Sequence, residues 1–510
     1  MGKPARRRSA LACVLGAVVL CGMLAGCVVA PEPAPEAPEA EAAPALPLEQ
    51  LAAFSGIAAM NAGSNCSGTL IDTGTASGPA YVLTNGHCTG DVGRPAQQTT
   101  LGIEWGGTAE FLRAEGYGER LTVEVVELAY STMRHTDTAI VRLDATLGEL
   151  QEFGLRAVPI AASEPAEGDA VVNVGVPVQG LDYDDWVLRR GDCTLGGQHT
   201  LIEFQWLWFG VWANDCPGII QGSSGSPLLS VDADGEPREI VGLINTTSVG
   251  STAAMGGACW LNRPCQVTAD GAVMVEGTSY AQSVAGMGSC FDAQGLFAIG
   301  GDCPLPVSSI WAEGSGGSFR GGGEPDSTGR VPSTSFVGAE AGEARTALVP
   351  IGDATACLEP ATYAGAALID LPAGGEVWEQ LGVPLPVDLP TEEGRFMVCA
   401  VAGDDYAGAA SQLFAVDRTP PVAPAGAVVE DAGDGAVIVW PRIDPPEVST
   451  VRFIWGDADE LDCDDTASFQ EFFTVPLFLA ADELPVRYCV YGLDEAGNRT
   501  EVEIVDIEGP

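Results

Sequence analysis

Short apolar runs, separated by Gly, Asp and Pro, recur along the chain from about residue 52 to residue 305. The runs are five to eight residues long and rich in Val, Ile and Leu, as expected for strands of a closed β core. The clearest of them are residues 80–84, 121–128, 139–143, 170–176 and 239–245. Apolar residues at helical spacing are scarce, and one helix is expected over residues 280–287. The pattern therefore predicts an all-β region.

The chain after this region divides at two places. Residues 314–323 contain six glycines and two serines, which predicts a flexible linker. Residues 417–421 contain two adjacent prolines, which interrupt both helices and sheet pairing and indicate a second junction. We therefore expect a linker over residues 311–333 and two small strand-rich units over residues 334–417 and 418–510.

Each of these two units ends near a strand that contains one cysteine, Cys399 in the first and Cys489 in the second. The second strand also contains two tyrosines and is followed by Asp-Glu-Ala-Gly-Asn at residues 494–498. This ending resembles that of fibronectin type III and bacterial Ig-like β-sandwiches. The resemblance implies two β-sandwich domains, whose expected ligand is a surface protein or a glycan.

A targeting segment opens the chain. Four basic residues within the first eight positions precede an apolar run over residues 10–24. The run is followed by Gly-Cys, and Leu-Ala-Gly-Cys resembles the lipobox of bacterial lipoproteins, which implies that Cys27 is lipidated. A plain secretory signal or a membrane anchor stays open as an alternative, although the run is short for a membrane span.

Residues 28–50 are largely Pro, Ala and Glu. Such a composition offers little to bury and is typical of an extended tether. We therefore expect a signal peptide over residues 1–27 and a tether over residues 28–50. The expected location is the bacterial cell envelope, with the protein anchored by lipid at the outer membrane or the cell surface.

Composition and charge narrow the classes of function. With 510 residues, of which 46% are hydrophobic, the chain is expected to be a globular protein of several domains. Its formal net charge of −47 should repel nucleic acids and anionic membranes. We therefore expect no nucleic-acid partner.

Cysteine usage indicates an oxidising compartment. Three of the 15 cysteines lie within residues 1–27, which leaves an even number in the rest of the chain. The sequence contains no Cys-x-x-Cys pair and no Cys/His cluster with zinc spacing, so we expect disulfides, no metal site and no cofactor. Pairing between neighbours would join Cys66 to Cys88, Cys193 to Cys216, Cys259 to Cys265, Cys290 to Cys303, Cys357 to Cys399 and Cys463 to Cys489. The sequence alone leaves other pairings open.

Three short segments carry the residue types of a hydrolytic nucleophile. They are Thr-Asn-Gly-His-Cys at 84–88, His-Thr-Asp-Thr-Ala-Ile at 135–140 and Gly-Ser-Ser-Gly-Ser-Pro at 222–227. A serine hydroxyl becomes a good nucleophile when an imidazole takes its proton, and a carboxylate can hold that imidazole in the required tautomer. The chain has three histidines, and His135 and His199 are expected to be structural.

These segments resemble the motifs of trypsin-like (chymotrypsin-fold) serine proteases. In that family a cysteine before a Gly-x-Leu-Ile strand, here Cys66, is bonded to the cysteine after the catalytic histidine, here Cys88. The resemblance implies that His87 is the general base, that Asp137 is the carboxylate that orients it and that Ser224 is the nucleophile.

The same resemblance implies the fold and the groups around the nucleophile. Residues 51–310 would form a chymotrypsin-like double β-barrel, in an all-β chain that continues with the two β-sandwiches. The backbone N–H groups of Gly222 and Ser224 would form the oxyanion hole. The substrate pocket would be lined by Gly218, Ile219, Gln221, Asn245, Thr246, Thr247 and Thr278. Because no Asp or His stands where basic or acidic side chains are usually selected, a small or apolar side chain is expected there.

No activation sequence of the digestive type precedes Cys66. Ser223 stands where those enzymes have an aspartate that pairs with a freed N-terminal amine, so we expect a site that does not depend on that ion pair. The expected function is a cell-envelope-anchored serine endopeptidase that cleaves proteins and peptides through an acyl-enzyme. The alternative is a catalytically inactive surface adhesion or binding lipoprotein with a protease-like domain.

Overall fold

The computed structural model describes most of the chain beyond residue 40. The described residues are 41–90, 98–251, 258–307, 309–313, 316–374, 383–385, 388–422, 426–442, 448–473 and 475–508. The predicted signal peptide, its Cys27 and the first part of the predicted tether lie outside them. None of the helices in the described ranges is long and apolar enough to cross a membrane.

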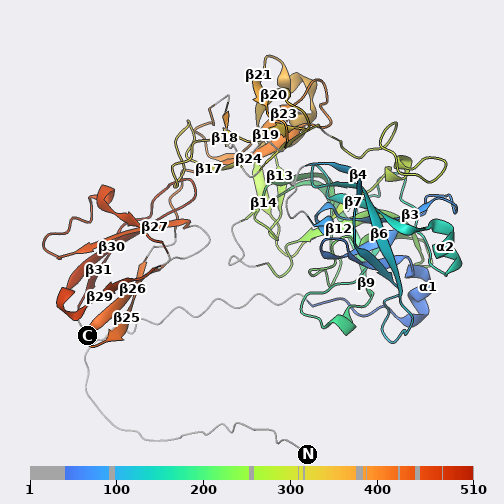
Figure 1. Cartoon of the computed structure of the whole chain (residues 1–510), viewed down its shortest axis with the longest axis horizontal. Helices are drawn as coiled ribbons and strands as arrows, with labels where there is room; N and C mark the ends of the chain where they lie inside the picture. The colour runs from blue at the N-terminus through green and yellow to red at the C-terminus, as the bar shows by residue number, and fades with distance from the viewer. Residues whose placement is uncertain are drawn as a thin grey trace, which may run out of the picture. The chain divides into compact units, whose positions relative to one another are not determined.

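The first part of the described chain forms a closed β-barrel (Figure 1, blue to teal). Its strands are β1 (Ile57–Asn61), β2 (Asn65–Leu70), β3 (Pro79–Thr84), β5 (Thr108–Phe111), β6 (Leu121–Thr132) and β7 (Thr138–Thr146), with β4 (Thr100–Glu104) paired on β6. Their order is β6-β5-β1-β2-β3-β7, and antiparallel pairing of β6 with β7 closes the ring. Closure pairs both edges of every strand in the ring.

The following part of the chain forms a second closed barrel. Its strands are β8 (Ala170–Gly175), β9 (Arg189–Glu203), β10 (Trp206–Asn214), β11 (Pro227–Val231), β12 (Pro237–Thr247) and β15 (Ser279–Ser283), with the hairpin of β13 (Cys265–Thr268) and β14 (Gly271–Met274) attached to β9. Their order is β10-β15-β12-β11-β8-β9, and pairing of β9 with β10 closes the ring. The two barrels confirm the predicted all-β, double-barrel fold.

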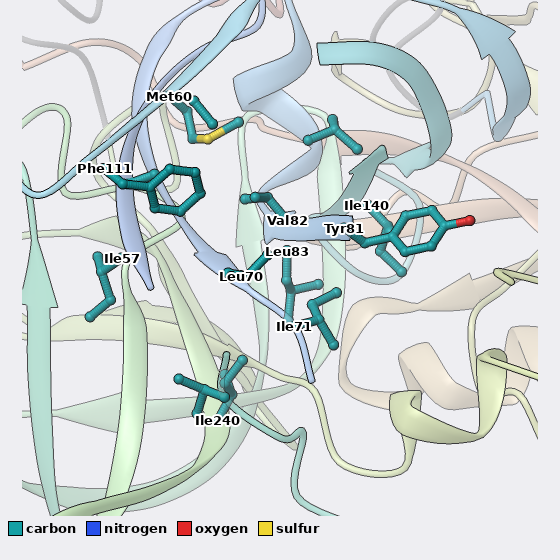
Figure 2. Close-up of a cluster of buried hydrophobic side chains, with 14 of the residues drawn as sticks. Ile57, Met60, Leu70, Ile71, Tyr81, Val82, Leu83, Phe111, Ile140 and Ile240 are labelled. Carbon is teal, nitrogen blue, oxygen red and sulfur yellow. The ribbon is translucent and has the colours of Figure 1, made fainter. Parts of the chain in front are cut away.

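The apolar core explains why these sequences form strands in these positions. Every residue of β3 after Pro79 is buried, as in a strand with packed side chains on both faces. Figure 2 shows Met60, Val82 and Phe111 of the first barrel in a cluster that also contains Ile240 of β12. One apolar cluster therefore spans both barrels and fixes the two rings against each other.

Helices are short throughout the described residues. They are α1 (Leu51–Phe54), α2 (Leu147–Glu152) and the 3₁₀ segments η1 (Leu48–Gln50), η2 (Gly86–Thr89), η3 (Tyr183–Asp185), η5 (Met287–Cys290), η6 (Ile351–Leu358), η7 (Pro360–Tyr363), η9 (Thr466–Ser468) and η10 (Ala481–Glu483). A capping box of Thr146 and Glu149 begins α2 directly after β7.

The chain after the barrels is also rich in strands. Up to residue 416 these are β16 (Ile310–Ala312), β17 (Gly317–Phe319), β18 (Ser333–Thr334), β19 (Phe336–Gly338), β20 (Gly342–Pro350), β21 (Ala367–Leu371), β22 (Val383–Pro384), β23 (Gly394–Val401) and β24 (Ala410–Val416). The largest sheet here has five strands in the order β17-β24-β23-β20-β21, and the pairs β16–β19 and β18–β22 are separate.

The last strands are β25 (Gly426–Gly433), β26 (Ala436–Arg442), β27 (Thr450–Gly456), β28 (Gln470–Glu471), β29 (Leu477–Leu479), β30 (Val486–Leu493) and β31 (Glu503–Ile507). They form one sheet in the order β25-β26-β29 and another in the order β28-β27-β30-β31. Both sheets contribute to one apolar cluster, for example through Val439 and Phe453, as the facing sheets of a sandwich do. The relation to fibronectin type III or Ig-like domains stays a prediction.

The structure differs from three sequence-based expectations. The helix expected over residues 280–287 is wrong, because these residues include most of β15, which is buried throughout and pairs with β10 and β12. The sequence Ser-Tyr-Ala-Gln-Ser of β15 has neither the alternation of a half-buried strand nor a continuous apolar run, so its residue pattern does not identify a strand. The predicted linker contains β17, whose backbone pairs in parallel with β24. The end of the predicted tether is folded, since Leu46 is only 2% exposed.

Candidate active site

His87 lies in η2, directly after β3, and contacts Asp137 at two points. The Nδ1 atom of His87 lies 2.7 Å from Oδ2 of Asp137, and the backbone N–H of His87 donates to Oδ1 at 3.0 Å. Asp137 is fully buried, and the side-chain amide of Asn85 donates to its backbone carbonyl at 2.8 Å. The carboxylate thus holds both the ring and the backbone of His87, which favours the tautomer with its proton on Nδ1.

The turn that carries His87 requires a glycine. A Cβ placed at Gly86 would overlap the backbone carbonyl of Thr132 at the end of β6. The sequence Asn-Gly-His therefore lets the turn approach β6 closely, which brings His87 within reach of the segment that carries Asp137.

A disulfide fixes the other side of the histidine. Cys88 is bonded to Cys66 of β2, so β2 and η2 are covalently joined next to the ring. The two sulfur atoms and a ring nitrogen of His87 lie within 4.8 Å of one another. Both sulfurs belong to the disulfide, so neither is a thiolate that could bind a metal ion.

Ser224 lies in the loop before β11, and this loop packs directly on the first barrel. The N–H of Ser67 in β2 donates to the carbonyl of Ser224 at 2.7 Å. Gly225 has φ +78°, and a Cβ there would overlap Ser67 and the hydroxyl of Thr84, three residues before His87. The two glycine-dependent turns therefore bring the segments of Ser224 and His87 together at the seam of the barrels.

Two backbone N–H groups of this loop make no hydrogen bond to the protein within the described residues. The carbonyl of Gln221 accepts hydrogen bonds from Val178 (2.9 Å), and that of Ser223 accepts one from Ser226 (2.9 Å). In a trans peptide the C=O of one residue and the N–H of the next point in opposite directions. The N–H groups of Gly222 and Ser224 therefore point away from the atoms that bond these two carbonyls. Among the hydrogen bonds of the described residues, neither of these two N–H groups donates to a protein atom.

Ser223 has its partners within the same loop. Its N–H donates to the carbonyl of Ile220 at 2.9 Å, and its hydroxyl accepts from the N–H of Ile220 at 3.2 Å. The buried side chain of Asn173 donates to Ser226 at 2.8 Å and secures the end of the loop. Ser223 and Ser226 are therefore held by neutral hydrogen bonds.

The residues expected to line the pocket come from three segments. Ile219 is buried after Gly218, while Gln221 is exposed at the end of the same loop. On β12, Asn245 and Thr246 are buried. The side chain of Thr247 lies 2.9 Å from Ser279 of β15, next to Thr278. The structure brings β12 and the start of β15 side by side through paired backbone.

The amide of Asn245 is the most unusual group among these. Both its oxygen and its nitrogen are buried, and neither has a hydrogen-bond partner among the described residues. A buried polar group without a partner costs about 1–3 kcal/mol.

Glu203, at the end of β9, was not anticipated from the sequence. It is 3% exposed, and one carboxyl oxygen accepts the N–H of Asn262 at 2.8 Å. Burial raises the pKa of Glu203 to about 7, against a lowering by Thr246, Asn262 and His87. One glutamate among 70 acidic residues carries no sequence signal of burial, and only the closed hairpin of β9 and β10 reveals it.

His135 is a core residue, two positions before Asp137. Its ring packs on Phe209 with 5.0 Å between centroids. Burial, with a smaller contribution from Arg134, lowers the pKa of His135 to about 3, so the ring is neutral at pH 7. The guanidinium of Arg134 is itself buried and donates to the carbonyl of Gly408 at 2.7 Å. This segment therefore fixes the backbone that leads to Asp137.

The remaining predicted cysteines also pair as neighbours. The structure contains disulfides between Cys193 and Cys216, Cys259 and Cys265, Cys290 and Cys303, Cys357 and Cys399, and Cys463 and Cys489. Together with the bond beside His87, they make six local disulfides, as expected from an exported chain.

Comparison with known proteins adds one family match. Residues 66–243 match the family model described as "Trypsin-like peptidase domain", a range that contains His87, Asp137 and Ser224. No curated protein matches the chain.

Several solved structures resemble part of the chain. Rv3671c from M. tuberculosis H37Rv, in an inactive mutant form, is 14% identical over 48% of this chain and 91% of its own, with a TM-score of 0.28. The thermostable serine protease AL20 from an extremophilic microorganism is 16% identical over 47% of this chain and 94% of its own, with a TM-score of 0.30. Protease Anisep from Arthrobacter nicotinovorans is 14% identical over 45% of this chain and 90% of its own, with a TM-score of 0.30. The family match and the two closed barrels support the same conclusion, that this part of the chain has the trypsin-like fold.

Proposed function

We propose that the chain is a serine endopeptidase that cleaves proteins and peptides with His87, Asp137 and Ser224. The Ser224 hydroxyl attacks the peptide carbonyl while its proton passes to Nε2 of His87. The negative charge that forms on the carbonyl oxygen is stabilised by the N–H groups of Gly222 and Ser224. His87 then gives the proton to the leaving amine, and an acyl-enzyme remains on Ser224. Water, deprotonated by His87, releases the acid and restores the serine.

The observation that carries this proposal is the double contact between Asp137 and His87. A buried carboxylate that bonds the ring at 2.7 Å and the backbone N–H at 3.0 Å supports a histidine of fixed orientation. No resident metal or cofactor takes part in the proposed chemistry.

Labelling with a fluorophosphonate probe tests the proposal, because the probe reacts with an activated serine. The full chain should be labelled at Ser224, Ser224→Ala should not be labelled, and Ser163→Ala, at an exposed serine, should behave as the parent chain. A folded, oxidised parent chain that resists the probe would instead support the alternative, an inactive surface adhesion or binding lipoprotein.

We further propose that the enzyme is held in the bacterial cell envelope by a lipid on Cys27, with residues 418–510 and the preceding unit as binding domains for a surface protein or a glycan. The lipobox-like sequence before Cys27 and the sandwich-like sheets support this. Metabolic labelling with a palmitate analogue should mark the parent chain and not Cys27→Ala. Equal labelling of both chains would rule the anchor out.

A further inference from the structure

The segment just before the first barrel packs on the second one. We name residues 43–46 the amino-terminal strap. The carbonyl of Pro44 accepts the N–H of Arg190 at 3.1 Å, and the N–H of Leu46 donates to the carbonyl of Leu188 at 2.7 Å. Ala45 forms an antiparallel bridge with Arg189. The strap is thus an added strand along the beginning of β9, although its composition is that of a tether.

Side chains secure the same contact. Nη1 of Arg189 donates to the carbonyl of Ala43 at 2.9 Å. Ala43 and Leu46 are 8% and 2% exposed, and Leu46 belongs to the apolar cluster that spans both barrels. An extended segment with two buried side chains, two backbone–backbone hydrogen bonds and a third from the Arg189 side chain is an integral part of the domain.

The strap also touches the loop that leads to the nucleophile. A Cβ placed at Gly218 would overlap the backbone nitrogen of Ala43 and lie 2.5 Å from its Cα. Gly218, which has φ +73°, therefore packs directly against Ala43 of the strap. From Gly218 the loop runs through Ile219, Ile220 and Gln221 to the N–H groups of Gly222 and Ser224.

Several contacts hold this loop before it reaches Ser224, since Ile219 is buried and the carbonyl of Gly222 accepts from the hydroxyl of Ser67 at 3.1 Å. At its start Cys216 is bonded to Cys193 of β9, and at its far end Gln221 accepts from Val178. Between these points Gly218 rests on Ala43. Displacement of the strap would remove the contact at Gly218, in the middle of the loop, while the contacts of Ile219 and Gly222 remain. The positions of the two N–H groups depend on the course of that loop.

We propose that the amino-terminal strap is a positioning element of the active site, which holds residues 218–222 so that the N–H groups of Gly222 and Ser224 face the reacting carbonyl. The inference rests on the proposed function. In this proposal, an internal and uncharged segment of the chain supports the loop that carries the two N–H groups. Cleavage within residues 28–40 would then release an active enzyme from its anchor, whereas disruption of the strap would inactivate it.

Two glycine variants of the full chain test the strap. Gly218→Ala introduces a Cβ that overlaps Ala43, whereas Gly116→Ala has nearly the same φ, +72°, and no atom within 4 Å of the new Cβ. The pair therefore separates the collision from backbone strain. We expect Gly218→Ala to lower kcat by about tenfold or more, since loss of one oxyanion donor costs roughly 10²–10³ in kcat. KM should change less than kcat, and Gly116→Ala should stay within about twofold of the parent chain.

A second pair of variants keeps the test decisive if Gly218→Ala does not fold. Arg189→Ala removes the side-chain bond to Ala43, and Arg189→Lys can restore a donor at that carbonyl. We expect a kcat loss of about threefold to tenfold in Arg189→Ala, the scale of one hydrogen bond, and partial recovery in Arg189→Lys. Unchanged kcat in folded Gly218→Ala, or in both Arg189 variants, would overturn the proposal.

Hydrogen exchange distinguishes failure of the strap from failure of the proposed function. If the parent chain is not labelled by the fluorophosphonate probe, the proposed function fails whatever the strap does. Amide exchange in residues 217–223 should still be faster in Arg189→Ala than in the parent chain, because the backing of the loop is weakened. Equal exchange in the two chains would contradict a supporting role for the strap.

Discussion

At the scale of single residues, Asp137 carries two functions that one carboxylate performs together. Its two oxygens separately bond the ring and the backbone N–H of His87. An amide in its place keeps the size of the side chain but changes one oxygen into a donor. The ring would then bond the amide in the wrong tautomer, with the proton on Nε2, where the base should accept one.

We therefore expect Asp137→Asn to lower kcat by about 10⁴-fold while the chain still folds. Steady-state hydrolysis of a peptide ester, together with thermal unfolding, measures both effects. Asp144→Asn, an exposed acid on the same strand β7, is the matched control and should keep parental kcat. A loss of less than about tenfold in Asp137→Asn would argue against His87 as the general base.

Glu203 predicts a dependence of stability on pH. Its pKa is raised from the ordinary 4.5 to about 7, chiefly by burial. Between pH 4.5 and about pH 7, the carboxyl of Glu203 is therefore protonated in the folded chain and ionised in the unfolded chain. The stabilisation is complete below pH 4.5 and decreases as the pH rises toward 7, by up to about 3 kcal/mol over that window.

Glu203→Gln should remove this loss, because the amide does not ionise. Urea unfolding at pH 5 and pH 8 should show a smaller difference in the free energy of unfolding for Glu203→Gln than for the parent chain. Glu239→Gln, at an exposed glutamate, should retain the parental difference. The interpretation fails if Glu203→Gln and Glu239→Gln give the same pH dependence.

At the scale of elements, the disulfide between Cys66 and Cys88 joins the barrel strand β2 to η2, the short segment that carries His87. Removing a cross-link between residues 22 positions apart destabilises a protein by about 3 kcal/mol in the chain-entropy account. The bond between Cys290 and Cys303 spans 13 positions and should contribute a similar amount.

The double variant Cys66→Ala/Cys88→Ala should therefore lose about as much stability as Cys290→Ala/Cys303→Ala but far more activity. A displacement of His87 by about 1 Å can cost 10²-fold in rate, whereas the second pair lies on η5 and its following loop. Thermal unfolding and kcat measured on both double variants decide this. Equal kcat in the two would mean that the bond beside His87 has no positioning role.

The elements also show how far the sequence predicts this structure. The strand cores around residues 80–84 and 139–143 are recognisable because β-branched runs end at Gly, Asp or Pro, and the triad candidates follow from motifs beside them. The strand β15 was not predicted, because its sequence Ser-Tyr-Ala-Gln-Ser neither alternates nor forms an apolar run although all five residues are buried. The strap was not predicted, because its Pro- and Ala-rich sequence resembles a tether. Its extended structure depends on hydrogen bonds with β9, more than 140 positions later in the chain.

At the scale of the whole molecule, acidic residues outnumber basic ones by 70 to 23. Charges of one sign repel one another across the folded surface and reduce the stability of the compact state. Salt screens this repulsion, with a Debye length of about 30 Å at 0.01 M and about 10 Å at 0.1 M. The same field attracts cationic peptides toward the enzyme at low salt.

We therefore expect two opposite effects of salt on the full chain. Raising NaCl from about 0.01 M to 0.5 M should raise Tm, because the repulsion is screened, and should lower kcat/KM for an arginine-rich peptide while kcat stays constant. A neutral peptide of the same length is the control for the second effect, since its encounter with the enzyme is not steered by charge. Calorimetry and initial rates at several salt concentrations measure both. A Tm that falls with salt would show that local ion pairs, such as the one between Arg142 and Glu127, outweigh the net negative charge.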